Sequence, residues 1–188
     1  MKSYITVYED VLPHNFCEDT ILKFEQNTEH EQELTEWGNR RFMEINITNN
    51  NNWEKENDVM VRTIKQLWRR YVDEHKIILD LQFPKTFGFE QFRMKRYLPN
   101  GIDQFSFHTD VGSYASSRRF LSFLFYLNTV QDGGMTKFSY SPDITPFASI
   151  PAVQGRVLIF PPLWTYPHWG EKVVSGPKYI ISGYLHYL

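Results

Sequence analysis

Apolar residues recur at two different intervals along the chain and divide it into two parts. In the first part they recur at helical spacing, which predicts a helix within residues 12–26 and a longer one over residues 53–75. A short alternating segment at residues 4–8 predicts a strand ahead of both helices. The longer helix would carry one apolar stripe, formed by Val59, Ile64, Leu67, Trp68, Tyr71 and Val72.

From about residue 83 onward the pattern changes to short aromatic and β-branched runs separated by glycine and proline. Such runs are typical of the strands of a β-sandwich or jelly roll. The run FLSFLFYLN at residues 120–128 is almost continuously apolar, as expected of a strand covered on both faces. We therefore predict an α+β fold that is mainly β: a double-stranded β-helix, or jelly roll, with N-terminal helices packed on one sheet.

Composition narrows the possible classes of protein. The 188 residues, 41% of them hydrophobic, suit one domain over residues 1–188, with helical support over about 1–82 and the jelly-roll core over about 83–188. A net charge of −2 without a long basic block argues against nucleic-acid partners.

The single cysteine, Cys17, excludes an intrachain disulfide. No apolar run resembles a signal peptide or spans a bilayer, so we expect a soluble, cytoplasmic protein with no membrane partner.

The segment FSFHTDVG, residues 105–112, places His108 and Asp110 on the same face of a predicted strand. A core histidine followed by an aspartate that caps a turn would explain this pair without any chemistry. A third polar candidate, His168, follows three further strand-like runs. Two histidines and one carboxylate can occupy one face of an octahedral metal and leave three positions open, an arrangement that favours non-haem Fe(II).

Two other predicted strands carry polar residues that alternate along one face. In the last strand, Lys178, Ser182 and Tyr184 would share a face. An ammonium on the inner face of a barrel-like sheet needs a compensating anion, for which a bound carboxylate is the natural partner. The alternative is a charge on an edge strand that discourages aggregation.

The strand that precedes the His108 segment raises the same question. Gln91, Arg93, Lys95 and Tyr97 would share one of its faces. If that face points inward, it favours an acidic or carboxylate-bearing substrate. If the strand lies at a sheet edge, these residues are solvated surface charges, which is the interpretation that we favour from the sequence.

Five segments between residues 96 and 185 resemble, in order, the Fe(II)- and 2-oxoglutarate-dependent dioxygenases, especially their prolyl 4-hydroxylase-like branch. RYLPNGIDQFSFHTD resembles the family's Tyr-x-x-x-Gly approach to H-x-D, and RRFLSFLFYLN its Arg-containing strand ending in Tyr-Leu-Asn. GGMTKF is similar to its Gly-Gly-x-Thr turn, QGRVLIFPP to its Gly-Arg-led strand, and PHWGEKVVSGPKYIISGYL to its last metal histidine with a basic residue downstream. Met135 departs from the acidic residue common at that turn, which leaves the substrate more open.

The resemblance implies a role for each matching residue. It implies that Fe(II) is bound by His108, Asp110 and His168. The residues that it assigns to 2-oxoglutarate are Lys178, on the distal carboxylate, with Tyr126, Tyr97 and Ser182. The residues that we expect near the substrate are Arg119, Tyr97 and Trp164.

The resemblance also implies the reaction. We expect a dioxygenase that uses Fe(II), 2-oxoglutarate and O2, with ascorbate as a candidate reductant, to hydroxylate an unactivated C–H bond and release succinate and CO2. The expected substrate is a prolyl residue of a peptide or protein. The alternatives are a hydroxylase of a free amino acid or other small molecule, and a non-catalytic jelly-roll module that binds a metal. Loops at about residues 37–52 and 139–149 are expected to cover the site.

Overall fold

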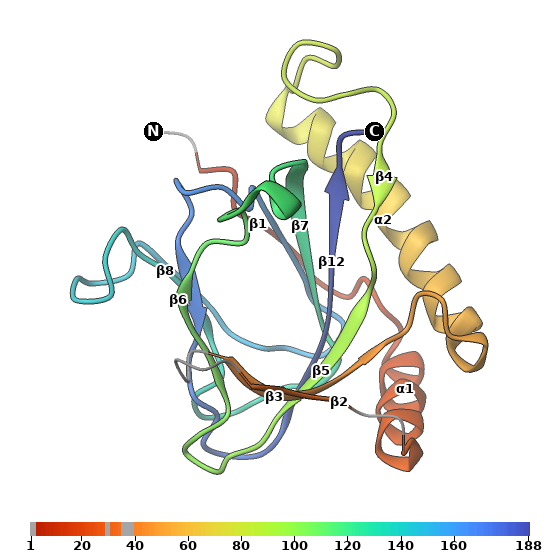
Figure 1. Ribbon diagram of the computed structural model, residues 1–188, viewed down its shortest axis with the longest axis vertical. Helices are drawn as coiled ribbons and strands as arrows, with labels where there is room; N and C mark the ends of the chain where they lie inside the picture. The colour runs from red at the N-terminus through yellow and green to blue at the C-terminus, as the bar shows by residue number, and fades with distance from the viewer. Residues whose placement is uncertain (1–2, 29–30, 35–39) are drawn as a thin grey trace.

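The computed structural model describes residues 3–28, 31–34 and 40–188, and shows a strongly curved sheet with two helices on its outer side (Figure 1). The elements of its first part are β1 (Thr6–Tyr8), α1 (His14–Gln26), β2 (Glu31–Leu34), β3 (Arg40–Asn46), the helical turn η1 (Asn51–Trp53) and α2 (Glu54–His75). Those of the second part are β4 (Gly88–Phe89), β5 (Arg93–Tyr97), β6 (Gln104–His108), the turn η2 (Tyr114–Ser116), β7 (Arg119–Tyr126), β8 (Thr136–Phe138), β9 (Ala148–Ile150), β10 (Val157–Phe160), β11 (His168–Gly170) and β12 (Lys178–His186).

The strands pair in the order β1-β10-β7-β12-β5-β3-β6-β11-β8-β9, and each of these pairings is antiparallel. The sheet curls so that β6, β8 and β11 face β7 and β12 across the interior (Figure 1). This is the predicted mainly β jelly roll with N-terminal helices on one side, so the predicted fold class is confirmed.

The alternation of side chains on the central strands divides the interior into two cores. On β7 and β12, one set of apolar side chains packs toward the helices with Phe24, Met60, Ile64 and Tyr71; it includes Leu121, Phe123, Phe125, Ile181 and Leu185. The intervening set packs inside the curl; it includes Tyr126 and Ile180, together with Leu158 and Phe160 of β10. The predicted stripe of α2 is therefore the surface that covers the outer face of the sheet.

The N-terminal part supplies more strands than the sequence pattern indicates. Residues 40–46, which we expected in a covering loop, form β3, paired with β2 on one side and with β5 and then β6 along the other. That expectation is wrong for these residues. Their polar sequence does not indicate a strand, and β3 forms because strands distant in the sequence hydrogen-bond to it. Residues 35–39 lie outside the described residues. Of the segment 139–149, residues 139–147 connect β8 to β9 and the last two belong to β9; its covering role stays a prediction.

None of the helices in the described ranges combines the length and the apolar character that crossing a bilayer would require.

Gly183, in the middle of β12, lets the ring of Phe92 lie directly on the strand. A Cβ atom at this position would lie 2.5 Å from Cδ1 and 2.6 Å from Cε1 of the buried Phe92 ring. We expect Gly183→Ala to lower the free energy of unfolding by about 1–3 kcal/mol, since the added methyl group would overlap a ring that is packed in the core. Thermal unfolding measures the effect. Gly176→Ala is the matched control, because a Cβ there meets no described atom within 4 Å, and equal losses in both variants would contradict the prediction.

Candidate metal centre and adjoining pocket

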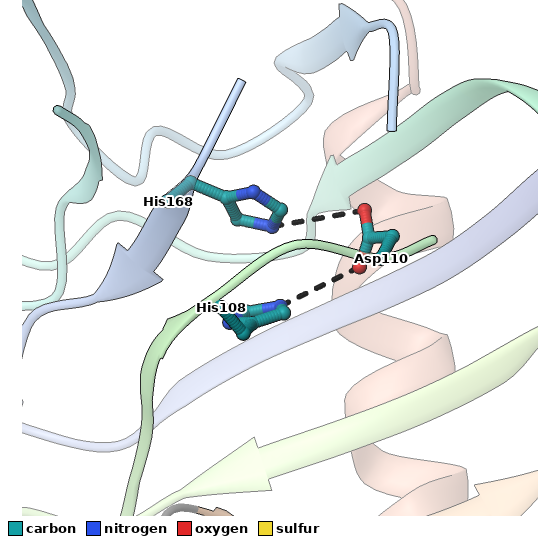
Figure 2. A group of neighbouring side chains, drawn as sticks. All are labelled: His108, Asp110 and His168. Carbon is teal, nitrogen blue, oxygen red and sulfur yellow. Dashed lines mark ion pairs between the residues drawn. The ribbon is translucent and has the colours of Figure 1, made fainter. Parts of the chain in front are cut away.

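Two strands that are distant in the sequence bring the predicted metal ligands together. β6 and β11 run antiparallel with the Cα atoms of His108 and His168 directly opposite each other. Asp110 follows β6 in the next loop and turns its carboxylate between the two imidazoles (Figure 2). The ring centroids of the histidines are 4.3 Å apart.

The potential ligand atoms of the three residues all lie within 4.8 Å of one another. Asp110 Oδ1 is 3.4 Å from His108 Nε2, and Asp110 Oδ2 is 3.7 Å from His168 Nε2. Both separations are too long for ordinary hydrogen bonds but short enough for ligands of one ion. The three side chains are also largely buried: the exposed fraction is 15% for His108, 5% for Asp110 and 6% for His168.

Backbone carbonyls orient both imidazoles toward the shared point. His108 Nδ1 lies 2.7 Å from the carbonyl oxygen of Ser106, and His168 Nδ1 lies 3.1 Å from that of Tyr166. A carbonyl can only accept, so each Nδ1 carries the hydrogen and each Nε2 presents a lone pair. Among the described residues, His108 Nε2 and Asp110 Oδ2 are buried without a hydrogen-bond partner. Such orphaned acceptors fit a metal cation, which would satisfy both.

The protonation states also suit a metal. Burial lowers the pKa of His168 to about 4, against the opposing effect of Asp110, so its imidazole is neutral at physiological pH. Burial alone would raise the pKa of the Asp110 carboxyl, but His168, His108 and the Tyr184 hydroxyl outweigh it and hold this pKa below its usual range. The site therefore offers neutral imidazole and ionised carboxylate, the forms that coordinate metals.

A second layer of contacts holds Asp110 in place. The hydroxyl of Tyr184 donates to Asp110 Oδ1 at 2.8 Å, and Arg119 Nη1 donates to the Asp110 carbonyl at 2.8 Å. The Arg119 guanidinium is itself paired with Glu90 at 2.8 Å and lies 4.0 Å from the centroid of the Tyr184 ring. Arg119, expected near the substrate, thus supports the loop of Asp110. Sequence reasoning placed Tyr184 on the correct face but did not assign it this contact.

A cavity extends from the three predicted ligands along the inner face of β12. Lys178, Ile180, Ser182 and Tyr184 line it, as the alternation along this strand predicts. Lys178 is 4% exposed, and its ammonium donates to the carbonyl of Gly134 at 2.6 Å. No ion pair within 4 Å joins Lys178 to a carboxylate in the part of the chain that the structure describes. β12 is also paired on both sides, by β7 and β5, so Lys178 is not the edge-strand charge of the alternative interpretation.

The other residues expected at the cosubstrate differ in their surroundings. Tyr97 and Ser182 line the cavity, and both are buried. Tyr126 lies behind Thr136, whose hydroxyl is 2.7 Å from the Tyr126 hydroxyl and which itself lines the cavity. The ring centroid of Tyr126 is 5.5 Å from the Lys178 ammonium. The sequence analysis did not assign Thr136 to the cavity beside Lys178 and Tyr126. Its position in the GGMTKF turn, which resembles the family's Gly-Gly-x-Thr turn, could have indicated it.

A wider groove of about 790 Å³ opens from the predicted metal ligands to the surface. It is lined by His108 and Asp110 and by charged residues of β3 and β5 and the loops beside them. Arg119 lies on its wall. Trp164, also expected near the substrate, is 78% exposed and lines neither this groove nor the cavity.

This jelly roll, with two histidines and one aspartate converging at a secluded point, has the architecture of non-haem iron oxygenases. The sequence matches the family described as the 2OG-Fe(II) oxygenase superfamily over residues 92–186. The chain therefore belongs to the 2OG-Fe(II) oxygenase superfamily and is an oxygenase whose family uses Fe(II), 2-oxoglutarate and O2. No curated protein sequence matches the chain at a significant level.

Solved structures of prolyl hydroxylases share the whole fold. A prolyl hydroxylase from Trichoplax adhaerens, in complex with a peptide fragment of the hypoxia inducible factor oxygen degradation domain, is 14% identical with a TM-score of 0.78 over 98% of this chain and 84% of that chain. A viral collagen prolyl hydroxylase from Paramecium Bursaria Chlorella virus-1 is 17% identical, with a TM-score of 0.69 over 99% and 97%. A prolyl-4-hydroxylase from Pseudomonas putida is 15% identical, with a TM-score of 0.69 over 100% and 94%.

Proposed function

We propose that the protein hydroxylates a prolyl residue of a peptide or protein, at a centre in which His108, Asp110 and His168 bind Fe(II). The observation that carries the metal assignment is the convergence of the three ligand atoms, two of them buried acceptors without a partner among the described residues. When bound together, Fe(II), 2-oxoglutarate and O2 supply an oxidant that replaces a C–H hydrogen by hydroxyl, with succinate and CO2 as the other products.

The residues of the cavity take the following parts in this proposal. Lys178 binds the distal carboxylate of 2-oxoglutarate, because its buried ammonium needs an anion. Ser182 and the Tyr126–Thr136 hydroxyl pair add polar contacts at the same cavity, and Tyr97 closes its wall. Tyr184 and Arg119 act through Asp110, which they keep in position.

The groove supports a peptide as the substrate. Its volume of about 790 Å³ exceeds what one amino acid needs, and it runs from His108 and Asp110 to open solvent. The Trichoplax adhaerens prolyl hydroxylase, which shares the fold, is in complex with a peptide fragment. A free amino acid or another small molecule would fill only part of this groove, and it remains the alternative for the experiment to exclude.

We also propose that residues 1–188 form a single oxygenase domain. Strands from β1 to β12 belong to one sheet, and the helices cover its outer face, so both parts of the chain contribute to one structure. A reducing compartment such as the cytoplasm would suit both the Fe(II) and the free thiol of Cys17.

The experiment that tests the function combines cosubstrate turnover with product mass. Purified protein is incubated with Fe(II), 2-oxoglutarate and ascorbate, first alone and then with proline-containing peptides and with free amino acids. We expect succinate release that increases with peptides, and a peptide product heavier by one oxygen atom on proline. Product formation on free amino acids alone would favour the small-molecule alternative. The absence of succinate under every condition would contradict the proposed reaction.

A further inference from the structure

Lys95 lies in the centre of the sheet with its side chain in the interior. β5 is hydrogen-bonded to β12 on one side and to β3 on the other, so it is not an edge strand. Lys95 is only 8% exposed, and Tyr97 on the same face is 6% exposed. The interpretation of this face as solvated edge charges is therefore wrong for Lys95, and the inward alternative applies.

Two aromatic rings lie near the Lys95 ammonium, whereas no carboxylate of the described residues lies within 4 Å of it. Its nitrogen lies 4.9 Å from the ring centroid of Phe42 and 5.7 Å from that of Phe105. No hydrogen bond or ion pair within 4 Å joins this nitrogen to another group in the described ranges. Burial lowers the pKa of Lys95, and the more distant Glu44 and Asp110 oppose this effect. Phe42 and Phe105 alone do not replace the water that the ammonium loses.

The carboxylates that line the groove with Lys95 face other groups. Glu44 lies opposite Lys95 in the register of β3 and β5, but its side chain is paired with Arg93. On the same groove, Glu90 is paired with Arg119, and Asp110 faces the two histidines. The protein thus keeps a buried cation for which an incoming anion would be the partner.

The position of Lys95 connects this cation to the reaction. Lys95 lines both the cavity of the metal ligands and the open groove, whereas Lys178 lines the cavity alone. The Phe105 ring lies beside the Lys95 ammonium and stacks on the His108 ring, with centroids 3.5 Å apart. An anion held by Lys95 would therefore lie next to the metal centre on the side that opens to solvent, separate from the anion site at Lys178.

We propose that Lys95 binds a carboxylate of the substrate, so that the enzyme selects carboxylate-bearing substrates. This inference rests on the proposed hydroxylase function and names the chemical class of substrate that the groove of the enzyme accepts. The carboxylate can come from a free amino acid, from the C-terminus of a peptide, or from an aspartate or glutamate side chain next to the target residue. Lys95 is thus a specificity-determining residue, distinct from the residues that hold the metal and 2-oxoglutarate.

Pairs of probes that differ only in a carboxylate test this selectivity. They also distinguish the three possible sources of the carboxylate. The pairs are L-proline and L-prolinamide, an N-acetylated Ala-Ala-Pro peptide as the acid and as the amide, and N-acetylated Asp-Pro-amide and Asn-Pro-amide. Succinate release above the level without probe is measured for each. We expect at least one acid to have a KM lower than that of its amide by about 10- to 100-fold, as for a hydrogen bond to a charged group.

Substitutions of Lys95 connect the selectivity to this side chain. Lys95→Met should raise the KM for the preferred acid to that of its amide, and Lys95→Arg should restore part of the preference. Lys65→Met, on the exposed face of α2, is the matched control and should keep the wild-type preference. Because the buried ammonium is costly in the free protein, Lys95→Met should unfold at the same or a higher temperature than the wild type.

The outcomes separate this inference from the function on which it rests. Succinate formation by the wild type without preference for any acid over its amide would overturn the role of Lys95 and leave the hydroxylase proposal standing. A complete absence of succinate would instead contradict the hydroxylase proposal. An unchanged acid preference in Lys95→Met with a lower unfolding temperature would make Lys95 purely structural. If Lys95→Met raised the KM for 2-oxoglutarate as much as the KM for the preferred acid, the anion bound by Lys95 would be the cosubstrate. That result would also overturn the inference.

Discussion

Alanine at His108, Asp110 or His168 is expected to abolish metal binding and succinate formation together. Each residue offers one of three potential ligand atoms that lie within 4.8 Å of one another, and the two that remain would hold a divalent ion poorly. Loss of residues that merely support metal ligands typically costs 10- to 100-fold in affinity, so we expect a loss above about 100-fold here. Titration with Mn(II) measures the affinity, and succinate release with Fe(II) measures the turnover.

His14→Ala is the matched control for these variants, because His14 is exposed at the start of α1, outside the curl of the sheet. Thermal unfolding distinguishes ligands from structural residues. Mn(II) should raise the unfolding temperature of the wild type and of His14→Ala, but not that of the three alanine variants. A variant at His108, Asp110 or His168 that binds Mn(II) with wild-type affinity would remove that residue from the centre.

Lys178→Met is expected to raise the KM for 2-oxoglutarate by at least about 100-fold while leaving Mn(II) binding intact. Removing one partner of a buried ion pair costs about 3–5 kcal/mol, which corresponds to this factor or more. Lys172→Met is the matched control, because Lys172 is exposed in the segment that precedes β12. Lys178→Met with an unchanged KM for 2-oxoglutarate would show that the dicarboxylate binds elsewhere.

The same lysine predicts how cosubstrate binding depends on pH. Burial lowers the pKa of Lys178 to about 8, against the opposing effect of Glu171. Only the protonated ammonium attracts the dicarboxylate, so affinity should be constant below this pH and fall by about tenfold per pH unit above it. The KM for 2-oxoglutarate measured from about pH 6.5 to 9.5 would reveal the bend.

Lys178→Arg separates this titration from other effects of alkaline pH. A guanidinium stays charged over the whole range, so the variant should lose the bend even where its affinity is weaker. A wild-type profile without a bend, or the same bend in Lys178→Arg, would show that another group controls the dependence.

Parts of the site could be predicted from the sequence because they follow from the local geometry of a strand. Alternation along β12 placed Lys178, Ser182 and Tyr184 on one face, and all three line the cavity. The H-x-D spacing likewise turned His108 and Asp110 toward the same region. The matching segments identified the family, because their glycines, histidines and carboxylate occur in a fixed order.

Other features depend on contacts between distant segments. Local patterns did not reveal β3, because its polar sequence forms a strand only where β2 pairs with one side of it and β5 and β6 with the other. They favoured the edge interpretation for Lys95, because whether a strand lies at an edge is decided by its neighbours. They also did not identify the hydrogen-bond partner of the Tyr126 hydroxyl, because Thr136 belongs to another strand.

The sequence by itself determined which residues alternate on each strand, where the helices lie, and which chemistry the polar residues can perform. The tertiary structure alone decided that His168 lies opposite His108, that Lys178 is enclosed at one end of the cavity, and that Lys95 points into the groove. The physical reason is that backbone geometry repeats over a few residues and can be read locally. Strand pairing, by contrast, joins segments that are far apart, and it is selected by the packing of the whole sheet.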